Sequence, residues 1–236
     1  MICILSQGVY YPLCSRNLVM TVKGVSAGQV CINRLEQYFT EQKLEKEIFH
    51  PDPTINSLAH KKKTGLKTAA VLIAASPENV DLTSSIILTL RSQNLNSHAG
   101  QVSLPGGTAD ASDINAVDTA LREAQEEVSL GRNRVKVLGC LGKIALPSGY
   151  LVTPVVGLID SFLNLTPFPD EVDEIFSVPL TTVLDPNAYK TKVKKTDSGN
   201  HQILEIQYNG YRIWGATAAI LYHLANEIEN NIKQKI

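Results

Sequence analysis

The sequence predicts an α/β fold with a mixed sheet, and three observations lead to that class. Segments rich in β-branched residues recur along the chain, as strands require. Two longer segments carry apolar residues at helical spacing. From residue 60 onward these elements follow the order β-β-α-β-β-loop-β-β-α rather than a βαβ alternation, so the sheet should contain antiparallel pairs. We therefore assign residues 60–236 to one domain and residues 1–59 to a partly helical N-terminal extension.

The N-terminal extension has the weaker patterns. Residues 1–29 show no sustained period, whereas the apolar stripe over 32–49 predicts a helix. The segment HPDPTINS (50–57) predicts a linker. The run HKKK (60–63) is typical of a solvated loop, with a phosphate contact as the alternative.

The domain begins with two strand-like runs, KTAAVLIAA (67–75) and SSIILTLRS (84–92), which should form a strand pair. Two further runs, RVKVLGCLGKIAL and YLVTPVVGLID, are separated by Pro147-Ser148-Gly149. The segment PFPDEVDEIFSVPL predicts a proline-rich loop that leads into a short element. Asn209-Gly210 between HQILEIQY and YRIW predicts a β-hairpin, because both turn residues tolerate positive φ.

Two helices complete the domain. The first is expected to follow a cap at Ser112 or Asp113, to run to about Ser129 and to end at Gly131. We expect its glutamates to lie mostly away from its apolar face. That face consists of Val117, Leu121, Ala124 and Val128. The second helix spans about 216–233, with apolar residues at intervals of 3, 4, 3 and 4.

Composition narrows the classes of function. The 236 residues are 44% hydrophobic and carry a net charge of −1, so no global field favours nucleic acid or an anionic membrane. The longest apolar run, 69–75, is far too short to span a membrane. Four cysteines without a C-x-x-C pair are typical of free thiols, with a disulfide among the first three as the alternative. With no signal peptide at the N-terminus, we expect a cytoplasmic protein, and a homodimer is one option for its assembly.

An acidic cluster stands out in TALREAQEEV (119–128). Glu123, Glu126 and Glu127 are spaced i, i+3 and i+4, which places three like charges on one helical face. The simplest interpretation is a solvated helix face. A hard divalent cation such as Mg²⁺, bound together with substrate phosphate oxygens, would instead relieve the repulsion. Arg122 can hold a neighbouring carboxylate, and Gly106-Gly107 permits a sharp turn whose N–H groups can approach an anion.

The same region resembles a known family. The segment GGTADASDINAVDTALREAQEEVSL (106–130), with its R-E-x-x-E-E core, resembles the Nudix box. The stretch LTLRSQNLNSHAGQVSLPGG (88–107) is similar to the additional signature of the coenzyme A diphosphatase subfamily of Nudix hydrolases. The resemblance covers about 60–230. It implies a Nudix-type α/β/α sandwich that cleaves a diphosphate by metal-assisted attack of water. The substrate would be coenzyme A or an acyl derivative, and the products adenosine 3′,5′-bisphosphate and 4′-phosphopantetheine or its acyl form.

The resemblance also implies roles for individual residues. Glu123 and Glu127 would be the principal ligands of Mg²⁺ or Mn²⁺, and Glu126 a third ligand or the group that orients water. Arg122 would fix a carboxylate. The implied base is a later glutamate, Glu171 first and Glu174 second, with a surface acid as the alternative. The substrate loop would be formed by Gly106 and Gly107, and Arg91 would reach a phosphate or remain a surface charge.

Three positions depart from the family pattern. Asp113 replaces a glutamate and lies one residue further from the arginine, Ser129 replaces a glycine, and Asn96 replaces an arginine of the upstream signature. Losing a bidentate arginine is not conservative. Asn96 therefore keeps open a Nudix enzyme for ADP-ribose or a dinucleotide, and with Ser129 it keeps open a catalytically silent binding module.

Overall fold

The computed structural model describes residues 25–41, 65–77, 83–160, 164–196 and 199–235. Its helices and strands follow the predicted α/β order with several short additions. In chain order they are α1 (Ala27–Glu41), β1 (Lys67–Ser76), β2 (Ser85–Arg91), β3 (Val102–Ser103), β4 (Gly106–Thr108), α3 (Ala116–Val128), η1 (Arg132–Arg134), β5 (Val135–Cys140), β6 (Ile144–Ala145), β7 (Tyr150–Ile159), β8 (Val172–Pro179), α4 (Leu180–Val183), η2 (Pro186–Ala188), β9 (Lys190–Thr196), β10 (Gly199–Tyr208), β11 (Tyr211–Trp214) and α5 (Gly215–Lys233).

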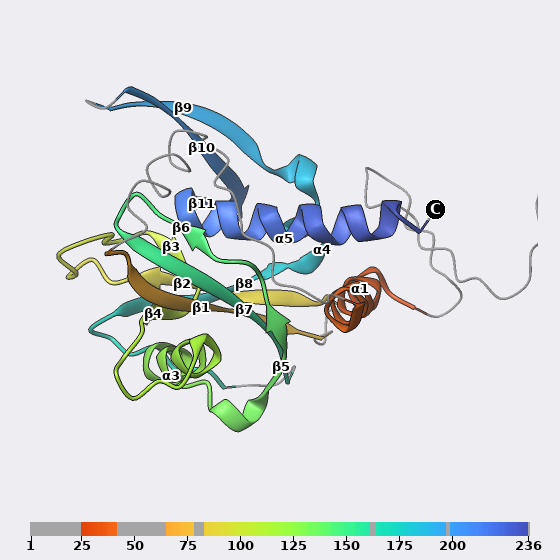
Figure 1. Ribbon diagram of the computed structural model, residues 1–236, viewed down its shortest axis with the longest axis horizontal. Coiled ribbons are helices and arrows are strands. Elements are labelled where there is room, and N and C mark those ends of the chain that lie inside the picture. The colour runs from red at the N-terminus through yellow and green to blue at the C-terminus, as the bar shows by residue number, and fades with distance from the viewer. Residues whose placement is uncertain (1–24, 42–64, 78–82, 161–163, 197–198, 236) are drawn as a thin grey trace, which may run out of the picture.

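The larger sheet lies between two helical layers. Its main path is β3-β2-β1-β7-β5, while β4 pairs with β1, β6 with β7 and β8 with β2. β1 and β7 run parallel, and the other pairs are antiparallel. Helix α3 covers one face, and α5 with α1 covers the other (Figure 1). The predicted α/β sandwich with a mixed sheet is therefore confirmed.

β1 is central because both of its faces are buried. Ala70, Leu72 and Ala74 pack in the cluster that includes α3, whereas Ile73 and Ala75 pack in the core on the opposite face. A strand buried on both sides must be apolar throughout, which explains the unbroken run from residue 69 to 75. The predicted pairing of β1 with β2 is confirmed as antiparallel.

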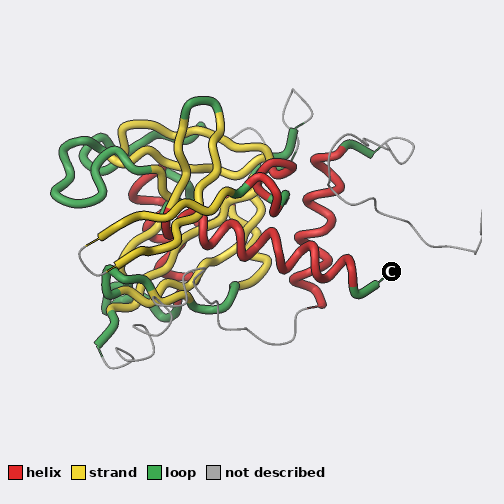
Figure 2. The backbone as a smooth tube through the Cα atoms, turned by 90° about the horizontal axis from the view of Figure 1, so that it is seen from above, coloured by secondary structure: helices red, strands yellow, loops and turns green. Residues whose placement is uncertain are grey.

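A second sheet, β11-β10-β9, lies beside α5 and extends beyond it (Figures 1 and 2). The hairpin predicted at Asn209-Gly210 is confirmed, with φ of 46° and 86° at the two turn residues. Leu204, Ile206 and Ile213 are buried in the core that contains α5. One face of this small sheet thus joins the main core, which stabilises a sheet too small to stand alone.

Helix α1 belongs to the same core as α5, although it lies within the range 1–59. Its side chains Cys31, Ile32, Leu35 and Tyr38 are buried there. The helix begins five residues before the predicted start at residue 32. The predicted end near residue 49, the linker and the HKKK run lie outside the described residues.

Three local predictions were wrong or incomplete. Asn115, not Ser112 or Asp113, caps α3, because its side chain accepts hydrogen bonds from the N–H groups of the second and third helical residues. The segment 167–180 contains a full strand, β8, that pairs along most of β2. β9 was not predicted at all, because alternating lysines hid a strand that β10 holds in register.

Two predictions from composition can also be compared with the structure. Cys31 is buried and Cys140 half-buried, and no disulfide joins these two residues; the other two cysteines lie outside the described residues. Among the helices that the structure describes, none is long and apolar enough to cross a membrane.

Candidate active site

Helix α3 carries the acidic cluster and ends beside it. The helix closes at Ser129, which adopts a left-handed conformation (φ 57°, ψ 28°) and donates its N–H to the carbonyls of Ala124 and Gln125. A glycine would take this conformation without strain. Serine tolerates it here, and its hydroxyl donates to the Thr166 carbonyl at 3.1 Å. The segment that follows β7 is thereby joined to the end of the acidic helix.

Glu127 is the most buried member of the cluster. It is 2% exposed, so the expectation that the glutamates lie mostly away from the packed side of α3 was wrong for this residue. The Gly106 N–H donates to its Oε2 at 3.1 Å, and Arg91 Nη1 lies 3.5 Å from its Oε1. Burial removes water from the charged form and raises the pKa of Glu127 to about 7. Glu127 is thus a buried carboxylate whose charge is only partly compensated.

Glu123 is half-buried and lies against the backbone of β4. A Cβ atom at Gly107 would lie 2.6 Å from its carboxyl group, so a larger residue there would displace the Glu123 carboxylate. At Gly106, where φ is 153°, a Cβ would lie 2.4 Å from the Ala70 carbonyl oxygen. The two glycines therefore form a strand edge against the helix rather than the open turn expected from the sequence. Burial raises the pKa of Glu123, although Arg122 opposes this.

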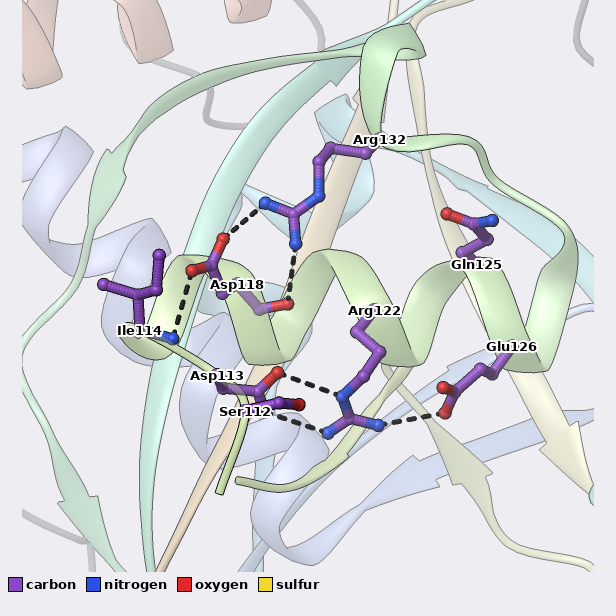
Figure 3. Close-up of a pocket in the computed structure, with 8 residues that line it drawn as sticks. All are labelled: Ser112, Asp113, Ile114, Asp118, Arg122, Gln125, Glu126 and Arg132. Atoms are coloured by element: carbon purple, nitrogen blue, oxygen red, sulfur yellow. Dashed lines mark hydrogen bonds and ion pairs between the residues drawn. The ribbon is translucent and has the colours of Figure 1, made fainter. Parts of the chain in front are cut away.

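Arg122 links the acidic helix to the loop before it (Figure 3). Its Nε and Nη2 each lie 3.1 Å from the Asp113 carboxylate oxygens, which is a bidentate pair. The same guanidinium reaches Glu126 at 2.9 Å, Glu123 at 3.0 Å and the Thr108 carbonyl at 2.9 Å. The pair with Arg122 holds the pKa of Asp113 well below its usual range. One planar cation thus fixes two glutamates that sequence analysis assigned to metal binding.

Asp113 is the residue whose role sequence reasoning missed. It was considered as a helix cap and as the family's spaced acid, but not as the partner of Arg122. Its position nine residues before that arginine is a signal that could have suggested the pairing. The hollow that it borders, about 480 Å³, lies beside Asp118, Glu126 and Arg132 on α3 and the residues after it (Figure 3). Neither Glu123 nor Glu127 lines this hollow.

The structure brings together Glu171, but not Glu174, with the acidic helix. Glu171 precedes β8, and its carbonyl accepts the N–H of Ser92, the residue after Arg91, at 2.9 Å. Its charge contributes to raising the pKa of both Glu123 and Glu127. Glu174 instead accepts the Tyr211 hydroxyl at 2.6 Å, and the Tyr211 ring stacks on Phe176. Glu171 therefore acts electrostatically on Glu123 and Glu127, whereas Glu174 is engaged with Tyr211.

The donor set fits a hard divalent cation, although the side chains are not arranged as a finished site. Within the described ranges, no group of three or more His, Cys, Asp or Glu residues is placed to hold a metal ion. Carboxylate oxygens are nevertheless the donors that Mg²⁺ and Mn²⁺ prefer. Burial is the main cause of the raised pKa values of Glu123 and Glu127, and the arginine beside each carboxylate offsets it only in part. Glu123, Glu126 and Glu127 would hold the ion, with Arg122 as their support.

Comparison with known protein families identifies the family to which the chain belongs. Residues 66–196, more than half of the chain, match the NUDIX domain. The chain belongs to the Nudix hydrolase family. It is therefore a hydrolase that acts on the diphosphate bond of a nucleoside diphosphate-linked compound, and this class generally needs divalent metal ions.

Curated relatives carry the same family name. An uncharacterized Nudix hydrolase NudL of Photorhabdus laumondii is 43% identical over 61% of this chain and 78% of the relative. The NudL proteins of Pectobacterium atrosepticum and Yersinia pestis are 41% and 34% identical, over 70% and 81% of this chain and 84% and 96% of the relatives.

Solved structures resemble the chain more distantly. The Nudix hydrolase RenU of M. smegmatis has a TM-score of 0.46 at 18% identity and covers 72% of this chain and 89% of its own. The NUDIX domain of Shewanella oneidensis NrtR, solved with ADP ribose, has a TM-score of 0.40 at 19% identity and covers 55% of this chain and 84% of its own.

Proposed function

We propose that this Nudix hydrolase cleaves the diphosphate bond of coenzyme A or its acyl derivatives in a reaction that depends on Mg²⁺ or Mn²⁺. Water would attack one phosphorus atom, and the bridging oxygen would leave with the other. The products would be adenosine 3′,5′-bisphosphate and 4′-phosphopantetheine or its acyl form.

The observation that carries this proposal concerns the segment LTLRSQNLNSHAGQVSLPGG. Arg91, near its start, and Gly106, near its end, both contact the carboxylate of Glu127. Both ends of the segment between Arg91 and Gly106 are therefore anchored at the same buried glutamate, Glu127. A loop anchored in this way is well placed to select the group attached to the diphosphate. The similarity of this segment to the coenzyme A diphosphatase signature supports coenzyme A as that group.

The chain's own residues would divide the chemistry. A bound divalent cation would supply Lewis-acid charge to the diphosphate and increase the acidity of the attacking water. Arg122 would keep Glu123 and Glu126 in fixed rotamers, so that little reorganisation accompanies the reaction. Arg91, whose side chain is 24% exposed, would direct its remaining N–H donors toward a phosphate oxygen. Glu171 would accept the proton of the attacking water.

A second candidate is favoured by Asn96. The related signature has an arginine at this position, and Asn96 lies exposed in the loop between β2 and β3. An amide cannot supply the bidentate, charged contact of a guanidinium. The alternative substrate is another nucleoside diphosphate compound, such as ADP-ribose or a dinucleotide.

Product analysis tests the choice of substrate. The protein is incubated with Mg²⁺ or Mn²⁺ and either coenzyme A or ADP-ribose, and the products are separated by chromatography. We expect adenosine 3′,5′-bisphosphate from coenzyme A, with the higher kcat/KM of the two substrates. Faster formation of AMP from ADP-ribose would instead establish the second candidate.

A loop substitution makes the test sharper. Asn96→Arg restores the residue of the signature, and we expect it to raise kcat/KM for coenzyme A more than for ADP-ribose. Asn94→Arg is the matched control, since it adds the same charge two residues away in the same exposed loop. An equal gain from both variants would mean that position 96 has no special contact with coenzyme A.

A further inference from the structure

A second cavity lies at the other end of α3 from Glu127. It has a volume of about 510 Å³, within the range of small-molecule sites. Its walls come from the start of β1, the loop before α3, the first turn of α3, the segment around Lys143 and the start of β7. Thr119 on this wall precedes Glu127 by eight residues, or about 12 Å along a helix axis. The cavity is therefore distinct from the acidic cluster, and none of the three helix glutamates lines it.

The cavity combines an apolar body with a hydroxyl group that faces it. Leu151, Val117 and several alanines supply most of the apolar lining. Thr153 also lines it and is only 6% exposed, yet its hydroxyl has no hydrogen-bond partner among the described residues. This hydroxyl is not among the fully enclosed side-chain atoms that lack a partner in the described residues, so it opens onto the cavity instead. Thr153 therefore offers a hydrogen-bonding hydroxyl to a polar atom of a ligand in the cavity.

The charged residues that line the cavity favour an anionic ligand. Among the described residues of the wall, the charged ones are Asp113 and Lys143. Asp113 is already paired through both oxygens with Arg122. Lys143 is exposed and has no carboxylate partner within the described part of the chain. The positive end of the α3 dipole adds to the same field.

We propose that this cavity binds a small organic anion with an apolar body, such as a medium-chain carboxylate. Its charged head would accept hydrogen bonds from Lys143 Nζ and the Thr153 hydroxyl, and its hydrocarbon part would lie against Leu151 and Val117. This site is independent of the diphosphate substrate, because its ligand would not contact the helix glutamates.

Titration with octanoate tests the site, with 1-octanol as the neutral probe of equal length. Binding is followed by amide chemical shifts in NMR spectra and by the protection of Cys140, which lines the cavity, from alkylation. Mass spectrometry of the Cys140 peptide separates this thiol from the others. We expect saturable octanoate binding with a Kd of roughly millimolar size, with shifts clustered at the cavity and slower alkylation of Cys140.

Variants distinguish a built site from general adsorption. Lys143→Gln should weaken octanoate binding about tenfold, and Thr153→Val about threefold. Lys136→Gln, which removes an exposed lysine of β5 paired with Glu36, is the matched control and should leave the affinity unchanged. Glu127→Gln should also leave it unchanged, because that residue belongs to the other end of the helix.

Four results would each overturn the proposal. They are the absence of saturation by octanoate, equal binding of 1-octanol, an unchanged affinity in Lys143→Gln, and loss of binding in Glu127→Gln. The last result would mean that octanoate binds at the catalytic cluster instead of this cavity.

Discussion

Helices α3 and α5 cover opposite faces of the same sheet, yet they bury different kinds of residue. Apart from Thr217, the buried residues of α5 are apolar, and Leu221 and Leu224 are among the most completely enclosed side chains of the protein. On α3, the carboxylate of Glu127 is buried beside Ala124 and Val128. Both helices are amphipathic, but only α3 has a charge on its packed side.

This difference assigns α3 mainly to the reaction and α5 mainly to the stability of the fold. An ionised carboxylate that is removed from water costs of the order of several kcal/mol unless it is fully paired. Glu127 has one N–H bond and one guanidinium at 3.5 Å, so the folded state without metal carries part of that cost. α5 buries no charged side chain, and its burial is almost entirely apolar. We therefore expect substitutions on α3 to change activity and substitutions on α5 to change stability.

The largest expected effect is on turnover. Glu127→Gln and Glu123→Gln should each lower kcat by roughly a thousandfold, because each removes charge from the group that binds the metal and stabilises the transition state. The check is steady-state kinetics with saturating Mg²⁺, on the preferred substrate. Glu229→Gln on α5 is the control, since Glu229 pairs with Lys233 in the next turn of the same helix, and its kcat should stay within about twofold. A loss below tenfold in both α3 variants would contradict the roles proposed for them.

A substitution on α5 should show the opposite pattern. Leu221 is completely buried, so Leu221→Ala should lower the free energy of unfolding by about 3 kcal/mol through lost burial and the remaining cavity. Urea denaturation measures this change. The kcat of the folded variant should match that of the parent protein. A large fall in kcat, without loss of stability, would show that α5 is part of the catalytic machinery.

The pH dependence of stability should reveal the buried charge on α3. The pKa of Glu127 rises from 4.5 to about 7 on folding, so the folded state holds this proton more tightly than the unfolded state. Stability from this group is fully present below pH 4.5 and is lost as the pH rises through 7. The metal-free protein should therefore lose about 2–3 kcal/mol between pH 4.5 and 8 through this residue.

Urea denaturation in EDTA at pH 4.5 and pH 8 measures this slope. Glu127→Gln cannot titrate and should reduce the difference between the two pH values, whereas Glu229→Gln should not. An identical pH dependence in the parent protein and Glu127→Gln would mean that folding does not raise the pKa of this carboxylate.

The strong periodic patterns were sufficient to predict the main strands, the hairpin at Asn209-Gly210 and both long helices of the domain. They failed where tertiary pairing decides the structure. β8 has an adjacent acidic pair near its start and β9 contains alternating lysines, and both become strands because β2 and β10 offer them hydrogen-bonding edges. Helical spacing placed the three glutamates on one face, but it could not show that Glu123 and Glu127 lie against β4.

The sequence could predict which residues form the site, but not which of them pair with one another. The sequence indicated Arg122 and the acidic cluster through their spacing. The bidentate pair of Arg122 with Asp113 depends on how the preceding loop folds back, which local spacing does not determine. The pairing of Arg91 with Glu127 joins residues 36 positions apart on different elements, so only the packed structure shows it.

The contacts that hold Glu127 from β2 and β4 also separate residues that cannot change freely from residues that can. Arg91 and Gly106 contact the Glu127 carboxylate. Asn96 lies exposed between them in the sequence and is not part of either contact. That connecting loop can therefore acquire or lose specificity contacts without altering the acidic helix. New substrate preferences can arise there while the hydrolytic apparatus is inherited intact.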